Sequence, residues 1–331
     1  AEEISLGKCE WDGQSFKNGS VKDENSKDSK LIQWNDKWIS KIGMGLRGMS
    51  RYRNSNVKAL NAVLKTPINV FETSPSETDG EDEWLLGDTL SKLSEVEPFD
   101  RNDLFIMTRG GWVRGKNLRV TEELIKRGNL QADIRKLSSE INLCLSPEFL
   151  KDQIERSLYR LGINYLDLFL LRIPLFIEKE MFDEIGKAFS VLEELCNEGK
   201  IKSFGLSVFE LEDKEINFVD FPLEVFCEKS PHANGFQAIE VAGNFINKRP
   251  FESEPGRESF VGRAKGLGLK VIAGNPLRAQ VEDKAVWLVD YFDDSSWEET
   301  AKELLNKAKN LEIEILQTPL ADNRTLEEAM R

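Results

Sequence analysis

This sequence of 331 residues has few histidines and cysteines, and it has fewer basic than acidic residues. His232 is the single histidine, which disfavours a Ser-His-Asp triad, and the four cysteines lack the spacing of a zinc site or a disulfide framework. The 45 basic and 58 acidic residues give a net charge of −13, which disfavours a nucleic-acid-binding or anionic-membrane-binding surface. Apolar runs are all shorter than the roughly 18 residues that span a bilayer. We therefore expect no metal site, no nucleic-acid partner and no transmembrane segment.

The first thirty residues are polar and show no apolar periodicity. Residues 11–30 read "WDGQSFKNGSVKDENSKDSK", a composition that favours a mobile polar arm over residues 1–30. The sequence begins with Ala1 rather than with methionine, so a processed chain is expected, with a trimmed chain as the alternative. We expect one domain over the remaining residues, 31–331.

Short apolar runs alternate with amphipathic helical patterns from Leu31 onward. In Pro147–Leu161 the apolar side chains recur on one face, Ser146 is a suitable N-cap, and Gly162 is suited to end the helix. Eight runs have the length of buried strands, and this alternation predicts an α/β protein whose parallel sheet closes into a (β/α)8 barrel, a TIM barrel. The predicted strands are Ile42–Leu46, Asn69–Thr73, Leu104–Thr108, Tyr165–Leu171, Ser203–Val208, Phe236–Val241, Lys270–Ala273 and Glu312–Leu316.

The connections between these runs carry further helices and two long loops. The loops, Gly110–Leu145 and Glu210–Gly235, would overhang the barrel mouth at the carboxyl ends of the strands. The tryptophans of Trp34–Trp38 would instead close the bottom of the barrel. Helical patterns are predicted at Asn54–Leu64, Gln131–Leu143, Phe182–Glu198 and Ser296–Asn310.

Three stretches resemble the aldo-keto reductases: "NVFETSPSETDGEDEWLLG", "SPEFLKDQIERSLYRLGINYLDLFLLRIP" and "FSVLEELCNEGKIKSFGLSVF". The resemblance runs from about Ile42 to the C-terminus. It implies a (β/α)8 barrel of aldo-keto reductase type with long mouth loops. It also implies descent from enzymes that reduce carbonyl groups with hydride from NADPH.

The same resemblance implies where the family's four catalytic groups would lie. The aspartate position holds Glu72, the tyrosine position Glu77, the lysine position Arg109 and the histidine position Arg172. A glutamate is ionised at neutral pH, more so beside arginines, and arginine does not release its proton. We therefore expect no catalytic residue here. Instead, the ion pairs Glu72–Arg109 and Glu77–Arg172 would fill the pocket that holds the catalytic groups in the family. The alternative is a Glu77 that burial keeps neutral, so that it can act as the acid.

The residues after Glu77 are also acidic. For Asp79 to Glu83, a solvated turn and a helix N-terminus explain the charge, because negative charge is favourable there.

The resemblance implies that the cofactor-binding positions are substituted as well. Val208, Glu240 and Asn275 stand where the family has its nicotinamide contacts and the serine of a phosphate-binding turn, although Gln237 would replace Glu240 if the register slipped. Arg324 is a possible remnant of the adenosine-phosphate site. We expect no bound cofactor, or NADPH if the protein is a reductase after all.

Three functions stay open. The first is a pseudoenzyme, a structural or regulatory subunit of a larger protein complex. The second is an anion-binding module built on Arg109 and Arg172, and the third is an NADPH-dependent oxidoreductase with a rearranged active site. For the first, we expect partner contacts from the arm and the mouth loops, with Trp112, Arg114 and Phe226 as anchors.

The location of the protein is expected from the processed start and from analogy with the family. An organelle is favoured, the chloroplast above all, with the cytoplasm as the alternative; a complex peripheral to a membrane fits this expectation.

Overall fold

The computed structural model describes residues 30–96, 99–138, 141–209, 218–229, 235–281 and 284–288. They belong to two compact units, Ala1–Pro276 and Leu277–Arg331. The described part of the second unit is an antiparallel hairpin of β13 (Arg278–Val281) and β14 (Lys284–Trp287). Several predictions lie outside the described residues and stay predictions: the arm before Lys30, the helix Ser296–Asn310, the strand Glu312–Leu316 and a single domain over 31–331.

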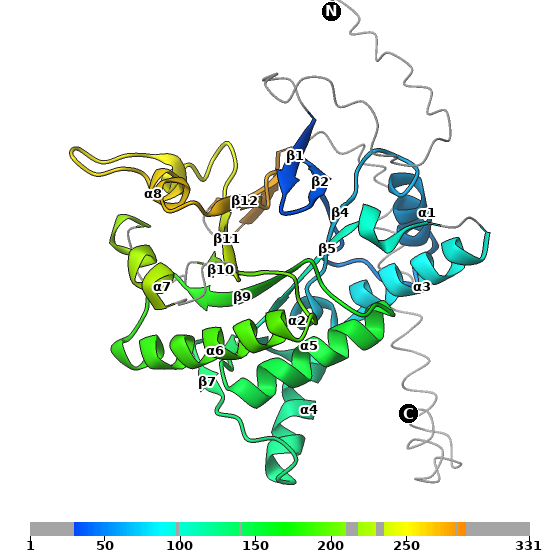
Figure 1. The fold of residues 1–331 in the computed structure, drawn as a ribbon, viewed down its shortest axis with the longest axis horizontal. Helices are drawn as coiled ribbons and strands as arrows, with labels where there is room; N and C mark the ends of the chain where they lie inside the picture. Colours follow the sequence, from blue (N-terminus) through cyan, green and yellow to red (C-terminus); the bar gives the residue numbers. More distant parts are fainter. Residues whose placement is uncertain are drawn as a thin grey trace, which may run out of the picture. The chain divides into compact units, whose positions relative to one another are not determined.

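A parallel sheet of seven strands organises the first unit (Figure 1). Its strands follow one another in space in the order of the sequence, and each is hydrogen-bonded to the next in parallel. This is the winding of a (β/α)8 barrel, as the sequence predicts, and each of these seven strands lies within three residues of its predicted ends. They are β3 (Met44–Gly45), β4 (Val70–Glu72), β5 (Phe105–Gly110), β9 (Leu168–Pro174), β10 (Phe204–Phe209), β11 (Phe236–Ala242) and β12 (Lys270–Gly274).

Helices connect the strands and cover the outer face of the sheet (Figure 1). Helix α5 begins at Pro147 and is capped after Leu161 by Gly162, whose φ of 64° is the left-handed conformation that glycine tolerates. Ser146 does not cap this helix through its side chain, because its hydroxyl accepts a hydrogen bond from the Asp133 N–H instead (2.9 Å). The helices that connect the strands outside the long segment after β5 include α1 (Asn54–Val63), α3 (Glu81–Val96), α5 (Pro147–Leu161), α6 (Lys179–Asn197), α7 (Leu223–Lys229) and α8 (Phe260–Gly266).

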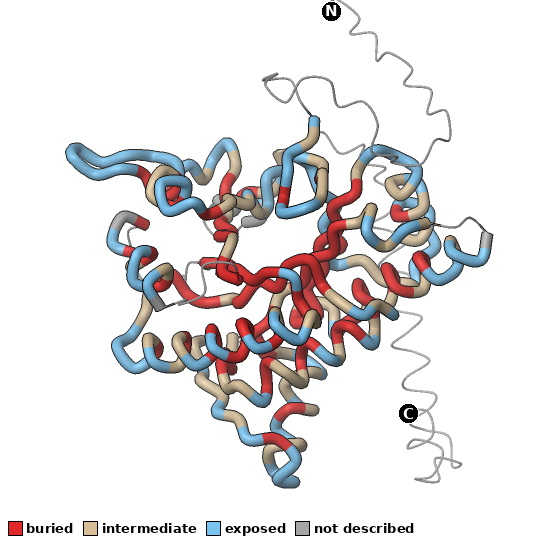
Figure 2. Tube along the Cα trace, viewed as in Figure 1, coloured by how far each residue is buried: buried red, intermediate tan, exposed pale blue. Residues whose placement is uncertain are grey.

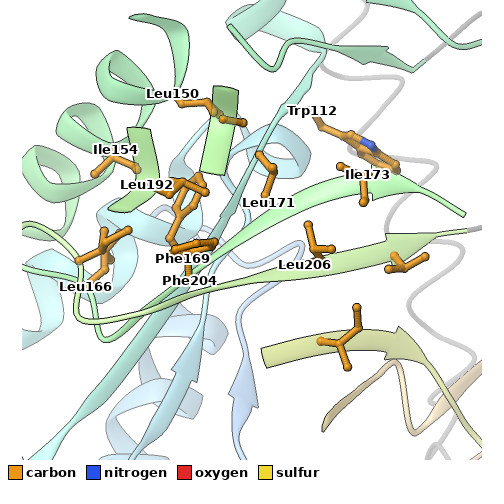
Figure 3. Close-up of a cluster of buried hydrophobic side chains, with 14 of the residues drawn as sticks. Trp112, Leu150, Ile154, Leu166, Phe169, Leu171, Ile173, Leu192, Phe204 and Leu206 are labelled. Atoms are coloured by element: carbon orange, nitrogen blue, oxygen red, sulfur yellow. The ribbon is translucent and has the colours of Figure 1, made fainter. Parts of the chain in front are cut away.

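The main hydrophobic core lies between the sheet and these helices (Figure 2). Alternate side chains of each strand point outward into it, because successive residues of a strand face opposite sides. Phe169 and Leu171 of β9, Leu206 of β10 and Leu150 and Ile154 of α5 belong to this core (Figure 3), all with no exposed surface. Burial of these side chains fixes which residues remain to face the interior of the barrel.

A second, smaller core fills the bottom of the barrel. The hairpin of β1 (Leu31–Trp34) and β2 (Lys37–Ser40) places Trp34 there, 5.0 Å from the Phe105 ring between ring centroids. The predicted closure of the bottom by the tryptophan segment is therefore confirmed for Trp34. The inward side chains in this layer are Val70, Phe105, Met107, Leu168, Leu170, Ala238 and, partly buried, Ile272.

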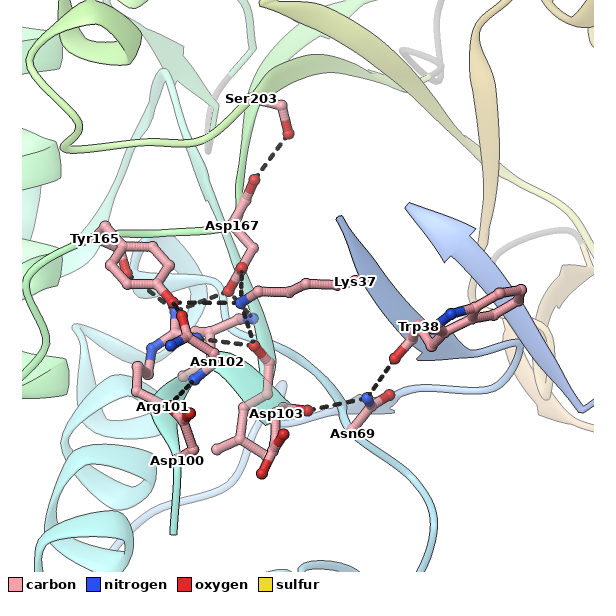
Figure 4. Close-up of polar contacts among 12 residues, drawn as sticks. Lys37, Trp38, Asn69, Asp100, Arg101, Asn102, Asp103, Tyr165, Asp167 and Ser203 are labelled. Carbon is pink, nitrogen blue, oxygen red and sulfur yellow. Dashed lines mark hydrogen bonds and ion pairs between the residues drawn. The ribbon is translucent and has the colours of Figure 1, made fainter. Parts of the chain in front are cut away.

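Asp167 attaches this hairpin to the sheet (Figure 4). Its carboxylate forms ion pairs with Lys37 (2.5 Å) and Arg101 (2.8 Å) and accepts the Ile106 N–H (2.9 Å). Asn69 adds a second attachment by donating to the Trp38 carbonyl (2.9 Å). Since the Asp167 side chain is buried and two cations depend on it, this network stabilises the lower end of the barrel.

The long connection after β5 differs from the prediction, because the expected helix at Gln131–Leu143 is wrong. Its helix is α4 (Gly115–Lys126), and strands before and after this helix form a small sheet, β6 (Trp112–Val113) before it and β7 (Arg135–Lys136) and β8 (Asn142–Leu143) after it. The spacing of Ile134, Leu137 and Ile141 imitates a helix face, but a turn at Ser138 folds the segment back on itself. The Leu137 N–H donates to the Ile141 carbonyl (2.8 Å), and the Ser138 hydroxyl accepts the Ile141 N–H (3.1 Å).

Candidate functional site

The barrel interior changes from apolar to charged toward the carboxyl ends of the strands. Every second side chain of a strand faces the barrel interior. One step closer to the carboxyl ends than the inward residues Val70, Met107 and Leu170, the strands therefore present Glu72, Arg109 and Arg172. Ser207 of β10 is paired with Arg172, and Glu240 of β11 is paired with Ser207. The five strands thus bring two arginines and two glutamates together at the barrel mouth.

Arg109 lies between two buried carboxylates. Its guanidinium is 3.3 Å from Glu72 Oε1 and forms a second, shorter ion pair with Glu240. The Arg109 and Glu72 side chains are each only 12% exposed. The predicted pair Glu72–Arg109 is therefore present, and Glu240 is a partner that the sequence did not predict.

Glu77 forms the second ionic group. Its Oε1 is 2.6 Å from the Arg172 guanidinium, as the sequence predicts, and its Oε2 is paired with Arg47. The guanidinium carbon of Arg172 lies 3.3 Å from the centre of the Trp112 ring and 5.5 Å from that of Phe209. Arg172 is therefore held by a carboxylate on one side and by aromatic rings on the other, which is a favourable setting for a desolvated guanidinium.

Asp82 positions the segment that carries Glu77, the short helix α2 (Pro75–Thr78). Its carboxylate accepts the Ser74 N–H (2.6 Å) and the Thr78 hydroxyl (2.6 Å), one at each end of the helix. Burial and the neighbouring Glu83 raise the pKa of Asp82 to about 6. The side chain of Asn117 in α4 adds a bond of 3.0 Å to the Pro75 carbonyl.

The expectation of a solvated acidic turn at Asp79 to Glu83 is wrong for two of its residues. Asp82 and Glu83 have no exposed surface. Glu83 accepts the Thr108 hydroxyl (2.8 Å) and pairs with Arg160 of α5 (2.6 Å). Both partners of Glu83 come from distant segments, so no local pattern in the sequence predicts its burial.

The two glutamates that face the arginines differ in their affinity for protons. Burial raises the pKa of Glu72 to about 7, although Arg109 opposes this effect. Burial also works against the ionised form of Glu77, but Arg172 and Arg47 outweigh it and hold the pKa of Glu77 below its usual value. Burial lowers the pKa of Arg172 to about 10, which still leaves it charged at neutral pH.

The expected cofactor positions are not gathered in one place. Val208 is buried among the outward core residues, whereas Glu240 faces inward opposite Ser207. Gln237 lies where the register between β10 and β11 shifts, so the register places Glu240 in the mouth. Asn275 is exposed with a φ of 55°, and Arg324 lies outside the described residues.

Two of the three predicted anchor residues for a partner are wrong. Trp112 is 7% exposed and packs on Arg172, and Phe226 has no exposed surface. Both side chains are already used in the core of this chain, while Arg114 is half-buried.

Among the residues that the structure describes, His, Cys, Asp and Glu form no group of three or more that could hold a metal ion. No described helix is both long and apolar enough to cross a membrane.

The winding of the sheet and the site at its carboxyl ends define a TIM-barrel protein, and comparisons with known proteins give the family. The family profile "Aldo/keto reductase family" matches residues 41–217, which is 177 of 331 residues and more than half of the chain. The chain therefore belongs to the aldo-keto reductase family.

Relatives of known name match shorter parts of the chain. The NADH-specific methylglyoxal reductase of Escherichia coli (strain K12) is 31% identical over 143 residues, which are 42% of this chain and 36% of that protein. The NADPH-dependent alpha-keto amide reductase of Saccharomyces cerevisiae is 35% identical over 100 residues, 30% of each chain. The chain thus matches only about a third of the length of these two relatives.

A solved structure with the same fold is an aldo-keto reductase from Bacillus halodurans in its holo form. It has a TM-score of 0.53 and 18% identity, and the match covers 80% of this chain and 72% of that chain. This likeness supports the barrel architecture.

Proposed function

We propose that this chain is a pseudoenzyme of aldo-keto reductase fold that serves as a structural or regulatory subunit of a larger protein assembly. The observation that carries the proposal is the network of ion pairs at the barrel mouth, in which Glu77 is paired with Arg172 and Arg47. At the position where the family's proton donor would lie, the chain has a carboxylate that its neighbours keep ionised. An ionised carboxylate gives up no proton and repels a developing alkoxide.

The charges of this network are internally matched. Three carboxylates, Glu72, Glu77 and Glu240, face the three guanidinium groups of Arg47, Arg109 and Arg172. Each arginine already has a carboxylate partner, so an incoming substrate carbonyl would have to compete with a glutamate for the guanidinium. This favours a filled pocket over an open active site.

A simple replacement of the missing groups should not restore reduction. The double variant Glu77→Tyr/Arg109→Lys supplies the family's proton donor and its lysine, but Arg172, Glu240 and Val208 remain at the other positions. With NADPH present, we expect the double variant to consume methylglyoxal no faster than the unmodified chain does. Turnover in the double variant would mean that the cofactor site is intact, and the proposal would then be wrong.

The assembly itself is tested by the mass of the native protein. We expect the chain from its native source to elute in a complex larger than its own 37.7 kDa, with companions in fixed stoichiometry. Specific complexes bury on the order of 1,000 Å² or more. Exposed apolar residues suited to such contacts lie in one loop after β11, where Phe245 is 83%, Ile246 50% and Phe251 45% exposed. Elution as a free monomer without companions would contradict the subunit role.

One observation favours the second candidate, an NADPH-dependent oxidoreductase with rearranged groups. Burial gives Glu72 a pKa of about 7, so this carboxyl carries a proton for part of the time at neutral pH. If Glu72 is the proton donor, the unmodified chain reduces aldehydes and Glu72→Gln abolishes the reaction. If the pseudoenzyme proposal holds, neither protein has activity.

The anion-binding alternative has weaker support. Arg109 and Arg172 are each only 12% exposed on their side chains and are paired with glutamates. A carboxylate or phosphate ligand would have to displace those glutamates.

A further inference from the structure

A pocket of about 390 Å³ lies outside the barrel, between α1 and α3. It is separate from the charged mouth, and neither the proposed function nor its alternatives use it. Helix α1 contributes Val57 and Asn61, α3 contributes Leu85, Asp88, Thr89 and Lys92, and the turn before α1 contributes Arg51 and Tyr52.

Arg51 is held at this pocket mainly by aromatic rings. Its guanidinium carbon lies 4.8 Å from the centre of the Trp84 ring and 5.1 Å from that of the Tyr52 ring, and one of its N–H groups donates to the Tyr52 hydroxyl (3.1 Å). The carboxylates of Asp88 and Glu81 are 3.5 and 3.6 Å away. These distances exceed those of a strong charged hydrogen bond, so the guanidinium retains capacity for a closer anion.

A second cation and an open aromatic face complete the lining. Lys92 is exposed and forms no ion pair with another described residue. Tyr52 is 77% exposed, so much of its ring is accessible, while Leu85 (1% exposed) and Val57 give the pocket an apolar part. Two carboxylates lie near these two cations, Asp88 in the lining and Glu81 beside Arg51. The cations are thus loosely paired at 3.5 and 3.6 Å or, for Lys92, without an ion-pair partner among the described residues, and each can approach a ligand more closely.

We propose that this pocket binds a small aromatic carboxylate. The ligand's carboxylate would lie between Arg51 and Lys92, because a guanidinium offers paired donors that match carboxylate geometry. Its ring would lie against Tyr52 and the apolar side chains of Leu85 and Val57. The volume is at the lower end of the range of roughly 300–1,000 Å³ for small-molecule sites, which fits a ligand of one or two rings.

The binding is tested by calorimetric titration of the full chain with 2-naphthoate. We expect saturable binding at one site per chain. Acetate lacks the ring and 2-naphthylmethanol lacks the charge, and both should bind more weakly. The proposal is overturned if 2-naphthoate gives no saturable signal up to about 10 mM, or if the neutral alcohol binds as well as the carboxylate.

Variants at the pocket locate the site. Lys92→Gln should weaken 2-naphthoate binding about two- to fivefold, the range of a single exposed ion pair, and Tyr52→Leu should also weaken it by removing the ring face. Lys187→Gln makes the same change of charge at an exposed position of α6 and should have no effect. Binding that Lys92→Gln and Tyr52→Leu leave unchanged would place the ligand elsewhere and contradict the proposal. None of these variants touches the barrel mouth, so the outcome does not depend on whether the chain is a pseudoenzyme.

Discussion

Replacing Glu72 with glutamine should stabilise the protein above neutral pH, because the ionised Glu72 carboxylate opposes folding. Burial raises its pKa to about 7 from an ordinary 4.5, although Arg109 lies 3.3 Å away. The folded protein therefore binds this proton more tightly than the unfolded chain, and stability falls as the pH rises from about 4.5 to about 7. At 1.36 kcal/mol per pKa unit, the difference of 7 − 4.5 corresponds to a cost of about 3 kcal/mol.

Glu72→Gln removes this cost and keeps a polar side chain opposite Arg109, which retains Glu240 as its partner. We expect a gain in the free energy of unfolding of about 1–3 kcal/mol at pH 8, and little change near pH 5, where Glu72 is protonated.

Glu77→Gln is the matched variant with the opposite sign. Arg172 and Arg47 outweigh burial and lower the pKa of Glu77, so its carboxylate stabilises the folded state above its unfolded pKa. That contribution is lost as the pH falls through the lowered pKa. The variant should therefore be less stable than the unmodified chain at pH 8, and the difference should persist at pH 5, because Glu77 is still ionised there.

Urea unfolding of the three proteins, followed by tryptophan fluorescence between about pH 5 and pH 8, measures these differences. A Glu72→Gln variant that is less stable than the unmodified chain at pH 8 would refute the reasoning. The reasoning would also be refuted if both variants changed the free energy of unfolding at pH 8 in the same direction, because ionisation would then affect folding in the same way at both glutamates.

Two further predictions concern stability away from the mouth. Asp167→Ala should lower the free energy of unfolding by about 2–4 kcal/mol, because Lys37 and Arg101 lose their buried partner; Asp152→Ala, which breaks a half-buried surface pair within α5, should cost less than about 1 kcal/mol. Gly87→Ala should cost about 1–3 kcal/mol, because its methyl group would lie 2.4 Å from the Arg160 carbonyl oxygen of α5. Gly266→Ala in α8 meets no atom within 4 Å and should cost nothing. Urea midpoints compare each pair.

The order of the strands could be predicted from the sequence because each strand carries its own local signal. Buried runs such as Phe204–Phe209 and the capped helix Pro147–Leu161 depend on residues close together in the chain. Patterns alone could not separate the hairpin of β7 and β8 from a helix, since Ile134, Leu137 and Ile141 have a helical spacing. The polar turn at Ser138 was the available signal.

Partners at the site were predictable only in part. The pairs Glu72–Arg109 and Glu77–Arg172 follow once the strand ends are aligned, because buried charges of opposite sign seek one another. Glu240 as a second partner of Arg109 depends on the register shift between β10 and β11, which no local pattern encodes. The burial of Trp112 was equally hidden, because Arg172 lies far from it in the sequence.

The most direct test of the central claim is a titration of the full chain with NADPH, followed by an assay for carbonyl reduction. Tryptophan fluorescence would report binding at concentrations up to about 1 mM, the upper end of usual KM values, with methylglyoxal as the carbonyl substrate. A mouth filled by the pairs of Glu77 with Arg172 and of Glu72 with Arg109 predicts no oxidation of NADPH above the rate without protein. Saturable NADPH binding accompanied by steady reduction of methylglyoxal would contradict it.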